Sequence, residues 1–122
     1  MKRVVVIDDD ESIRRTLGVL LERSGYAVVL APDGEEGLRS CRAAVPDLVM
    51  TDIHLPGIDG IEVGLALRTL APELPVIVMS GGDRTERLDL LGSALLLGAV
   101  RVLRKPFTID EALSAIETVL GG

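Results

Sequence analysis

The chain of 122 residues is long enough to bury one hydrophobic core, and we expect residues 1–122 to form a single domain. Its hydrophobic content of 48% excludes a disordered chain, and no apolar run approaches the length that spans a bilayer. The formal net charge of −6, from 13 Lys and Arg against 19 Asp and Glu, repels DNA phosphates, so we expect no direct nucleic-acid binding by this domain.

A single cysteine, Cys41, excludes an internal disulfide and fits the reducing cytoplasm, where we expect the protein to act. We interpret its thiol as a small apolar group in the core rather than as a redox sensor. Near the start, the apolar run Val4–Ile7 is ended by Asp8, Asp9 and Asp10. It is too short for an export signal, and we expect no association with a membrane.

Five short apolar runs, rich in β-branched residues, predict five strands. In chain order they are Val4–Ile7, Ala27–Ala31, Leu48–Met50, Val76–Met79 and Val100–Leu103. The first four runs contain little polar alternation, which is typical of strands buried on both faces of a sheet. Arg101 interrupts the last run, so we expect the fifth strand to lie at an edge of the sheet.

Apolar residues at helical spacing fill the intervals between these runs. The clearest sets are Ile13, Leu17, Leu20 and Leu21 in the first helix and Ile109, Leu113, Ile116 and Leu120 in the last. Three helices should begin with a reciprocal cap, in which an oxygen-bearing side chain is followed three positions later by Glu. These pairs are Asp33 with Glu36, Asp59 with Glu62, and Thr108 with Glu111.

A fourth helix, from about Thr85 to Leu97, carries more leucines than one buried face needs, and the surplus could serve a partner. When this fourth helix is included, predicted strands and helices alternate along the whole chain. Such alternation predicts an α/β fold, a parallel sheet with helices on both faces and right-handed crossovers. In sheets of this kind, ligands bind at the carboxyl ends of the strands.

Polar side chains follow four of the five predicted strands. They are Asp8, Asp9 and Asp10 after the first, Asp52 after the third, Ser80 after the fourth and Lys105 after the fifth. Carboxylates about 4 Å apart repel by roughly 4 kcal/mol at an effective dielectric constant near 20, and a divalent cation removes that penalty. Oxygen ligands in small number favour Mg²⁺, and no His–Cys cluster supports zinc.

A carboxylate beside Mg²⁺ can also act as a nucleophile toward a phosphoryl group. Catalysis of such a transfer depends mostly on positioning and on charge stabilisation by the cation and a lysine. Lys105 is the amine available for this purpose, and Ser80 is the hydroxyl.

The chain resembles the response-regulator receiver domain over its whole length. The motifs that carry the resemblance are VVVIDDD at 4–10, DLVMTDIHLPGIDG at 47–60, VIVMSG at 76–81 and RKPF at 104–107. The resemblance implies a flavodoxin-like (βα)5 fold, doubly wound on a five-stranded parallel sheet with strand order 2-1-3-4-5. It also implies a two-component signalling role, as a phosphorylation switch rather than an enzyme with turnover.

The resemblance assigns roles to positions of this chain. Asp52 matches the phosphoacceptor. Asp8 and Asp9 match the acidic pair that binds Mg²⁺, with Asp9 the more direct ligand. His54 matches the position whose backbone carbonyl binds the metal, so its imidazole is not required. Together, Asp8, Asp9, Asp52 and the His54 carbonyl are the expected metal ligands.

Two further positions complete the implied site. Ser80 matches the switch hydroxyl, and Lys105 matches the lysine that binds the phosphoryl group, with a cis bond to Pro106. The implied phosphoryl donor is the phosphohistidine of a histidine kinase or phosphotransfer protein. An output domain or partner protein, and a homodimer through the fourth helix, fifth strand and fifth helix, are further partners that the resemblance allows.

The sequence departs from the family at Val102, where receivers usually carry Tyr or Phe. Valine has a stiff χ1 and little volume to relocate, so the aromatic part of the switch cannot operate in its usual form. We expect the loop after the fourth strand and the fourth helix to carry the signal instead. Gly82 and His54 border the position of the hydrolytic water, and because Gly82 offers no shield we expect a modest phosphate lifetime.

Other interpretations remain open at single positions. Asp8–Asp10 could have no role other than to favour the start of the first helix through the helix dipole, and we expect Asp10 to have that role. A receiver-like scaffold with weakened phosphate signalling is compatible with Val102. An aspartate-nucleophile phosphatase of the haloacid dehalogenase type needs a second Asp two residues after the nucleophile, and that place is occupied by His54.

Overall fold

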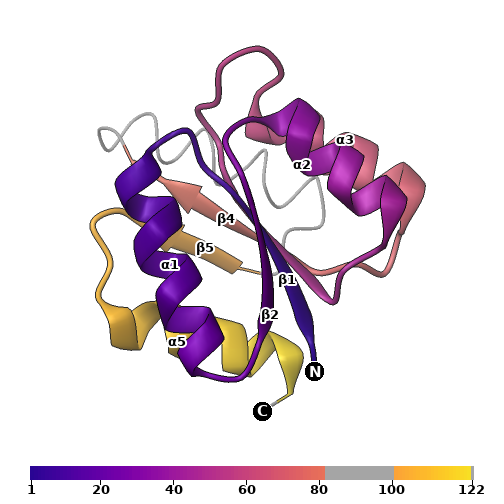
Figure 1. Ribbon diagram of the computed structural model, residues 1–122. Coiled ribbons are helices and arrows are strands. Elements are labelled where there is room, and N and C mark those ends of the chain that lie inside the picture. The colour runs from indigo at the N-terminus through magenta and orange to yellow at the C-terminus, as the bar shows by residue number, and fades with distance from the viewer. Residues whose placement is uncertain (82–100, 122) are drawn as a thin grey trace.

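A five-stranded parallel sheet organises the computed structural model, which describes residues 1–81 and 101–121 (Figure 1). Its strands are β1 (Arg3–Ile7), β2 (Ala27–Ala31), β3 (Leu48–Asp52), β4 (Val76–Ser80) and β5 (Arg101–Arg104). They lie in the order β2-β1-β3-β4-β5, which confirms the α/β fold and the strand order implied by the resemblance. The winding direction reverses between β1 and β3, so ligands are expected at the carboxyl ends of these two strands.

Helices cover both faces of the sheet. Those in the described residues are α1 (Glu11–Arg23), α2 (Gly34–Ala43), α3 (Gly60–Leu70) and α5 (Ile109–Leu120). Figure 1 places α1 and α5 on one face and α2 and α3 on the other. The predicted fourth helix, from about Thr85 to Leu97, lies outside the described residues, as do Gly82 and Val100.

Two apolar cores form because successive strand side chains point to opposite faces. On β1, Val4 and Val6 join the core under α1 and α5, whereas Val5 and Ile7 join the core under α2 and α3. All four side chains are fully buried. The β1 register places Val4 beside Val28 of β2 and Leu48 of β3, so hydrogen bonds hold this strand from both sides.

The predicted cap residues are confirmed, but the reciprocal cap forms at only one of the three described helices expected to carry it. The side chain of Asp10 caps α1, and Asp33 and Asp59 cap α2 and α3. At α5 the cap is reciprocal, because Glu111 N–H donates to Thr108 Oγ1 and the Glu111 carboxylate accepts from Thr108 N–H. At α2 the expected return bond is replaced, since the Glu36 carboxylate pairs with Arg39 at 3.2 Å. A guanidinium one turn away competes for that carboxylate.

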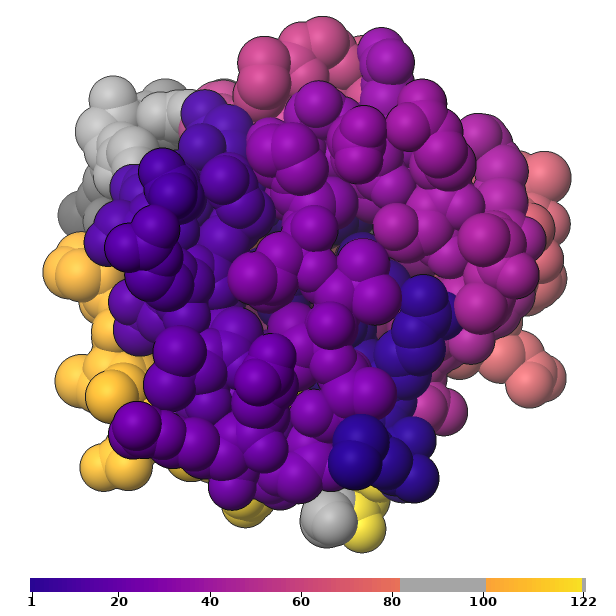
Figure 2. Space-filling view, viewed as in Figure 1, coloured from indigo at the N-terminus to yellow at the C-terminus, as the bar shows by residue number. Residues whose placement is uncertain are grey.

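Two predictions about burial were wrong. β2 is not buried on both faces: Leu30 is 42% exposed, because β2 is an edge strand with β1 as its partner. Figure 2 shows the side chains of α1, β2 and α2 on this face of the molecule. On α5, Ile109 is 55% exposed, whereas Ile116 is buried as expected and Ala112 and Ala115 are buried as well. Ile109 is the first helical residue, where the chain has only begun to approach the sheet.

The strand ends also differ from the predicted ones. β3 and β4 continue to Asp52 and Ser80, because the parallel ladder extends to the pairs Asp52 with Met79 and Ser80 with Arg104. The bond between Lys105 and Pro106 is cis, as expected, and the Cys41 thiol is buried. Within the described residues, no helix is both long enough and apolar enough to cross a membrane.

Candidate functional site

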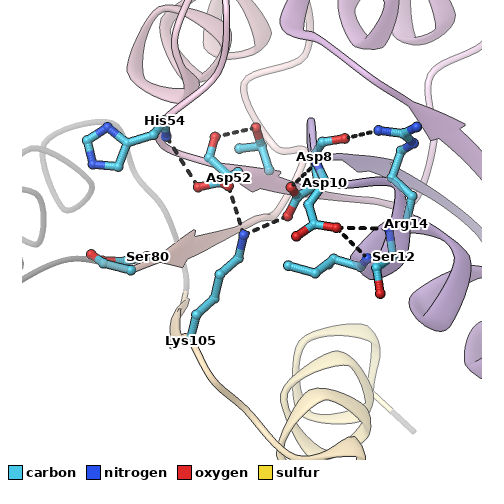
Figure 3. A network of polar contacts seen from close by, with 11 residues as sticks. Asp8, Asp10, Ser12, Arg14, Asp52, His54, Ser80 and Lys105 are labelled. Atoms are coloured by element: carbon cyan, nitrogen blue, oxygen red, sulfur yellow. Dashed lines mark hydrogen bonds and ion pairs between the residues drawn. The ribbon is translucent and has the colours of Figure 1, made fainter.

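Three charged side chains meet at the carboxyl end of the sheet, where the winding direction reverses. Asp8 follows β1, Asp52 ends β3 and Lys105 follows β5. The Lys105 Nζ lies 2.8 Å from Asp8 Oδ2 and 2.8 Å from Asp52 Oδ2 (Figure 3). The fold therefore brings together residues that are 97 and 53 positions from Lys105 in the sequence.

Lys105 forms the cationic centre of this group. Its side chain is 20% exposed, so both of its carboxylate contacts are shielded from bulk water. Burial acts to lower the pKa of the ammonium, but its hydrogen bonds to Asp52 and Asp8 outweigh burial and hold the pKa above 10.5. Lys105 is consequently charged at neutral pH and can bind an anion that displaces one of its partners.

Asp8 is the most deeply buried carboxylate of the site, with a fully buried side chain. Its Oδ2 accepts from Lys105, and its Oδ1 accepts from Asp10 N–H at 2.9 Å. Burial nevertheless raises the pKa of Asp8, and the neighbouring Asp52 charge adds to the rise. Ionised Asp8 is therefore held at a cost in free energy, which a nearby cation would reduce.

Asp9 completes an acidic cluster. One carboxylate oxygen from each of Asp8, Asp9 and Asp52 lies within 4.8 Å of the others, and Asp9 is the exposed member. Lys105 compensates one of these charges, so the group keeps an excess of negative charge. Carboxylate oxygens gathered this closely, with one open to solvent, suit a hard divalent cation that retains water ligands. These three residues could hold a metal ion.

Asp52 is fixed at both its carboxylate and its backbone. Oδ1 accepts from His54 N–H at 3.2 Å, while Oδ2 accepts from Lys105. The Thr51 hydroxyl, fully buried, donates to the Asp52 carbonyl at 3.0 Å. Gly60, at the start of α3, lies so close that an added Cβ would approach that carbonyl oxygen to 2.3 Å. Glycine at this position is therefore what allows α3 to begin directly beside Asp52.

Ser80 and His54 border the group without joining the Lys105 contacts. The Ser80 hydroxyl donates to the Gly81 carbonyl at 3.3 Å and points away from the Lys105 ammonium (Figure 3). The His54 imidazole points away from Asp52, and its backbone N–H is the group that contacts the carboxylate. Val102 lies on the sheet face under α2 and α3, packed against that core and next to Val78 in the strand register.

Arg14 and Thr51 are contact residues that the sequence analysis missed. Arg14 Nη1 donates to the Asp8 carbonyl at 2.7 Å, and Thr51 reaches the Asp52 carbonyl. A cation in the first turns of a helix is disfavoured by the helix dipole, but this signal does not single out Arg14, because Arg15 shares it and pairs with Glu11 on the surface. A buried hydroxyl such as Thr51 gives no comparable signal, because β-branched residues are common in strands.

Comparison with known proteins shows one family across nearly the whole chain. A family model described as response regulator receiver domain matches residues 4–117. The alkaline phosphatase synthesis transcriptional regulatory protein PhoP of Bacillus subtilis is 41% identical over 98% of this chain, and response regulator MprA of Mycolicibacterium vanbaalenii is 37% identical over 97%. The matched segments make up 48% and 50% of those proteins, so the chain spans about half their length.

Solved structures agree with this result. A CheY-like response regulator receiver domain protein from Methanospirillum hungatei superposes with a TM-score of 0.93 at 29% identity, covering 99% of this chain and 94% of that one. The chemotaxis protein CheY4 of Vibrio cholerae superposes with a TM-score of 0.89 at 29% identity, covering 98% and 99% of the two chains. The similarity therefore includes the complete fold of each of these single-domain structures.

Proposed function

Because the chain belongs to the response regulator receiver domain family, we propose that it is a phosphorylation switch that accepts a phosphoryl group on Asp52. The observation that carries the proposal is the contact of one ammonium, Lys105 Nζ, with both Asp8 and Asp52 at the end of the sheet. The transfer depends on Mg²⁺, and the domain, residues 1–122, changes a partner-binding face in response.

Asp52 supplies the nucleophile. One of its carboxylate oxygens attacks the phosphorus of a phosphohistidine, an O–P bond forms, and the P–N bond breaks as the imidazole leaves with the electron pair. His54 N–H and Lys105 hold the two oxygens in fixed directions, so the carboxylate has little freedom to rotate away. The Thr51 hydroxyl and Gly60 fix the backbone behind it.

Asp8, Asp9 and Asp52, with the backbone carbonyl of His54, are the groups that would hold Mg²⁺. The fit is supported by three clustered carboxylate oxygens and by the position of Asp8, whose pKa is raised by burial and, to a smaller extent, by the Asp52 charge. Mg²⁺ held by these groups would supply charge neutralisation for the carboxylates and for the phosphoryl oxygens. The exposed Asp9 leaves that side of the cluster open to solvent ligands.

Lys105 and Ser80 bind the transferred group. The Lys105 ammonium exchanges its contact with Asp52 Oδ2 for a contact with a phosphoryl oxygen, while Asp8 keeps the lysine in place. Ser80 must rotate, since its hydroxyl donates to the Gly81 carbonyl before phosphorylation. With Val102 in place of an aromatic residue, the signal passes through the loop after β4 and the predicted fourth helix. From residue 82 to residue 100, these lie outside the described residues.

Partners follow from the same proposal. The donor is a phosphohistidine on a histidine kinase or phosphotransfer protein, and the reaction takes place in the cytoplasm. An output domain or separate protein reads the phosphorylated state, as the relative PhoP, a transcriptional regulatory protein, suggests for a longer chain. A homodimer would assemble through β5, α5 and the predicted fourth helix, which lies outside the described residues.

Intact-mass measurement after incubation with a small-molecule phosphodonor and Mg²⁺ tests the proposal. One phosphoryl group per chain should be added to the wild type and to Asp110→Asn, an exposed aspartate of α5, but not to Asp52→Asn. Hydrolysis of the donor with turnover and no adduct would favour a phosphatase. No adduct and no Mg²⁺ binding would favour a receiver-like scaffold, the alternative that Val102 supports.

A further inference from the structure

Arg14 is the second cation that reaches the acidic loop of residues 8–10. It lies one turn after the cap residue Asp10, and its backbone N–H donates to the Asp10 carbonyl at 3.1 Å. Its side chain turns back along α1, and Nη1 donates to the Asp8 carbonyl oxygen at 2.7 Å (Figure 3). The side chain is partly buried by this contact, so its desolvation is compensated by a charge-assisted hydrogen bond.

The remaining contacts of the loop show what this bond controls. Asp8 N–H donates to the Ala31 carbonyl at 3.1 Å, and Asp10 N–H donates to Asp8 Oδ1 at 2.9 Å. The Asp10 side chain accepts from the amides of Ser12 and Ile13 at the start of α1. These bonds fix the two ends of the loop. The peptide group between them, which joins Asp8 to Asp9, is held at its carbonyl by Arg14.

Rotation of that peptide group would redirect the Asp9 carboxylate. Asp9 is the exposed member of the acidic cluster, so packing does little to fix its side chain, and its direction depends on the backbone. A hydrogen bond from Arg14 to the Asp8 carbonyl therefore restrains the one carboxylate that burial leaves free. Groups that orient metal ligands in this way commonly change metal affinity when they are removed.

The neighbouring Arg15 shows that a cation at this part of α1 does not need this role. Its side chain is 76% exposed and pairs with Glu11 at 2.8 Å, an i,i+4 contact on the helix surface. Exposed pairs of this kind contribute little to stability. Arg14 and Arg15 thus carry the same charge and lie on the same helix, but only Arg14 is seen to contact the acidic loop.

We propose that Arg14 is a positioning residue for the cation-binding carboxylates: by holding the Asp8 carbonyl it directs Asp9 toward the site. The inference rests on the proposed function, because it concerns the Mg²⁺ that the carboxylates would bind. Two effects of removing Arg14 have opposite signs. Loss of a positive charge near the carboxylates would tighten cation binding, whereas loss of positioning would weaken it. Our proposal requires the second effect to be larger.

Calorimetric titration of the domain with MgCl₂ measures the balance directly. Arg14→Met removes the donor and retains an aliphatic stem, and Arg15→Met is the matched control with the same change of charge. We expect the Mg²⁺ dissociation constant of Arg14→Met to rise about tenfold. Arg14→Lys, which restores a charged donor, should recover affinity to within about threefold of wild type. Arg15→Met should bind Mg²⁺ at least as tightly as wild type.

A second readout needs no metal. In the metal-free protein, the backbone amide resonances of Asp9 and Asp10 should shift in Arg14→Met and stay near their wild-type positions in Arg15→Met. Equal Mg²⁺ affinities for Arg14→Met and Arg15→Met, or tighter binding by Arg14→Met, would overturn the inference while leaving phosphorylation of Asp52 intact. Absence of Mg²⁺ binding by the wild type would overturn the proposed function and this inference together.

Discussion

β1 and the loop that continues it contain equally buried side chains that differ in what burial does to stability. Val4, Val5, Val6 and Ile7 are fully buried, and so is Asp8 directly after them. For the four apolar residues, removal from water stabilises the fold. For Asp8, burial raises the pKa and disfavours the ionised carboxylate. Burial therefore stabilises the fold along β1 and opposes the ionised carboxylate of Asp8, which directly follows that strand.

The difference shows where the fold carries unfavourable charge interactions. Lys105 satisfies Asp8 and Asp52 in part, but the third carboxylate of the cluster, Asp9, adds a further negative charge. A cation bound here would relieve the repulsion among these carboxylates, and the proposed phosphoryl group, which is itself anionic, would need that cation beside it. The apolar cores on the two faces of the sheet supply the stability that offsets the unfavourable interactions of this acidic cluster.

The core side of the comparison should give the largest effect. Met50 is fully buried under α1 and α5, two residues before Asp52. Met50→Ala removes apolar contacts and leaves a cavity, so the free energy of unfolding should fall by about 3 kcal/mol in chemical denaturation. Val45→Ala, at a site that is 54% exposed, should change it by less than about 0.5 kcal/mol. A loss below about 1 kcal/mol for Met50→Ala would contradict the assignment of this core.

Gly60 tests the boundary between the two regions. A Cβ at this position would lie 2.3 Å from the Asp52 carbonyl oxygen and 2.7 Å from Ile53 Cα, and backbone atoms cannot move aside easily. Gly60→Ala should therefore lower the free energy of unfolding by about 2 kcal/mol and slow phosphorylation by a small-molecule donor.

Gly18→Ala is the control for that substitution. A Cβ on Gly18 would meet Leu30 Cδ1 at 3.1 Å, at the flexible end of a side chain that is 42% exposed. The change should be close to neutral for unfolding and should leave the phosphorylation rate at its wild-type value. If both alanine variants have the same free energy of unfolding and the same phosphorylation rate, the close approach of Gly60 to Asp52 does not matter for either property.

Asp8 tests the site side of the comparison, with a smaller effect of opposite sign. Asp8→Asn removes a buried charge, so the metal-free variant should be more stable than wild type by about 1 kcal/mol at neutral pH. Asp9→Asn, which alters the exposed carboxylate, should gain less. Added Mg²⁺ should stabilise the wild type and have little effect on Asp8→Asn, because the variant has lost a cation-binding carboxylate.

The same variant has a predicted pH dependence. Folding raises the pKa of Asp8 above 3.8, so the protonated acid is the form that the folded state favours. Its contribution is complete below 3.8 and is lost as the pH rises through the raised value. Asparagine resembles the protonated acid at every pH. The advantage of Asp8→Asn, measured without divalent cations, should therefore be small near pH 3.8 and grow toward neutrality, and a constant advantage would contradict this account.

Much of the fold and of the candidate site could be predicted from the sequence. Apolar runs placed all five strands to within about two residues, and the polar residues at their ends brought Asp8, Asp52 and Lys105 to one edge of the sheet. These predictions work because the carboxyl ends of parallel strands meet at one edge. The strand order depended on the family resemblance, since hydrophobic periodicity does not specify which strands are neighbours.

Other features depended on tertiary contacts that no local pattern encodes. The strand order implied by the resemblance puts β2 at an edge, but its apolar run predicted burial on both faces, so the exposure of Leu30 was not foreseen. Ile109 has the right spacing for a buried face but occupies the first position of its helix. The direction of the Ser80 hydroxyl and the contact of Arg14 with the Asp8 carbonyl depend on backbone atoms brought close by folding.

The identity of the phosphorylated residue is the central claim, and reduction of the phosphorylated protein with borohydride tests it most directly. Borohydride converts an aspartyl phosphate to homoserine, which peptide mass spectrometry can locate in the chain. We predict homoserine at position 52 in the wild type treated with phosphodonor and Mg²⁺, and none in an untreated sample. Homoserine at position 8 or 9, or none anywhere, would contradict the account.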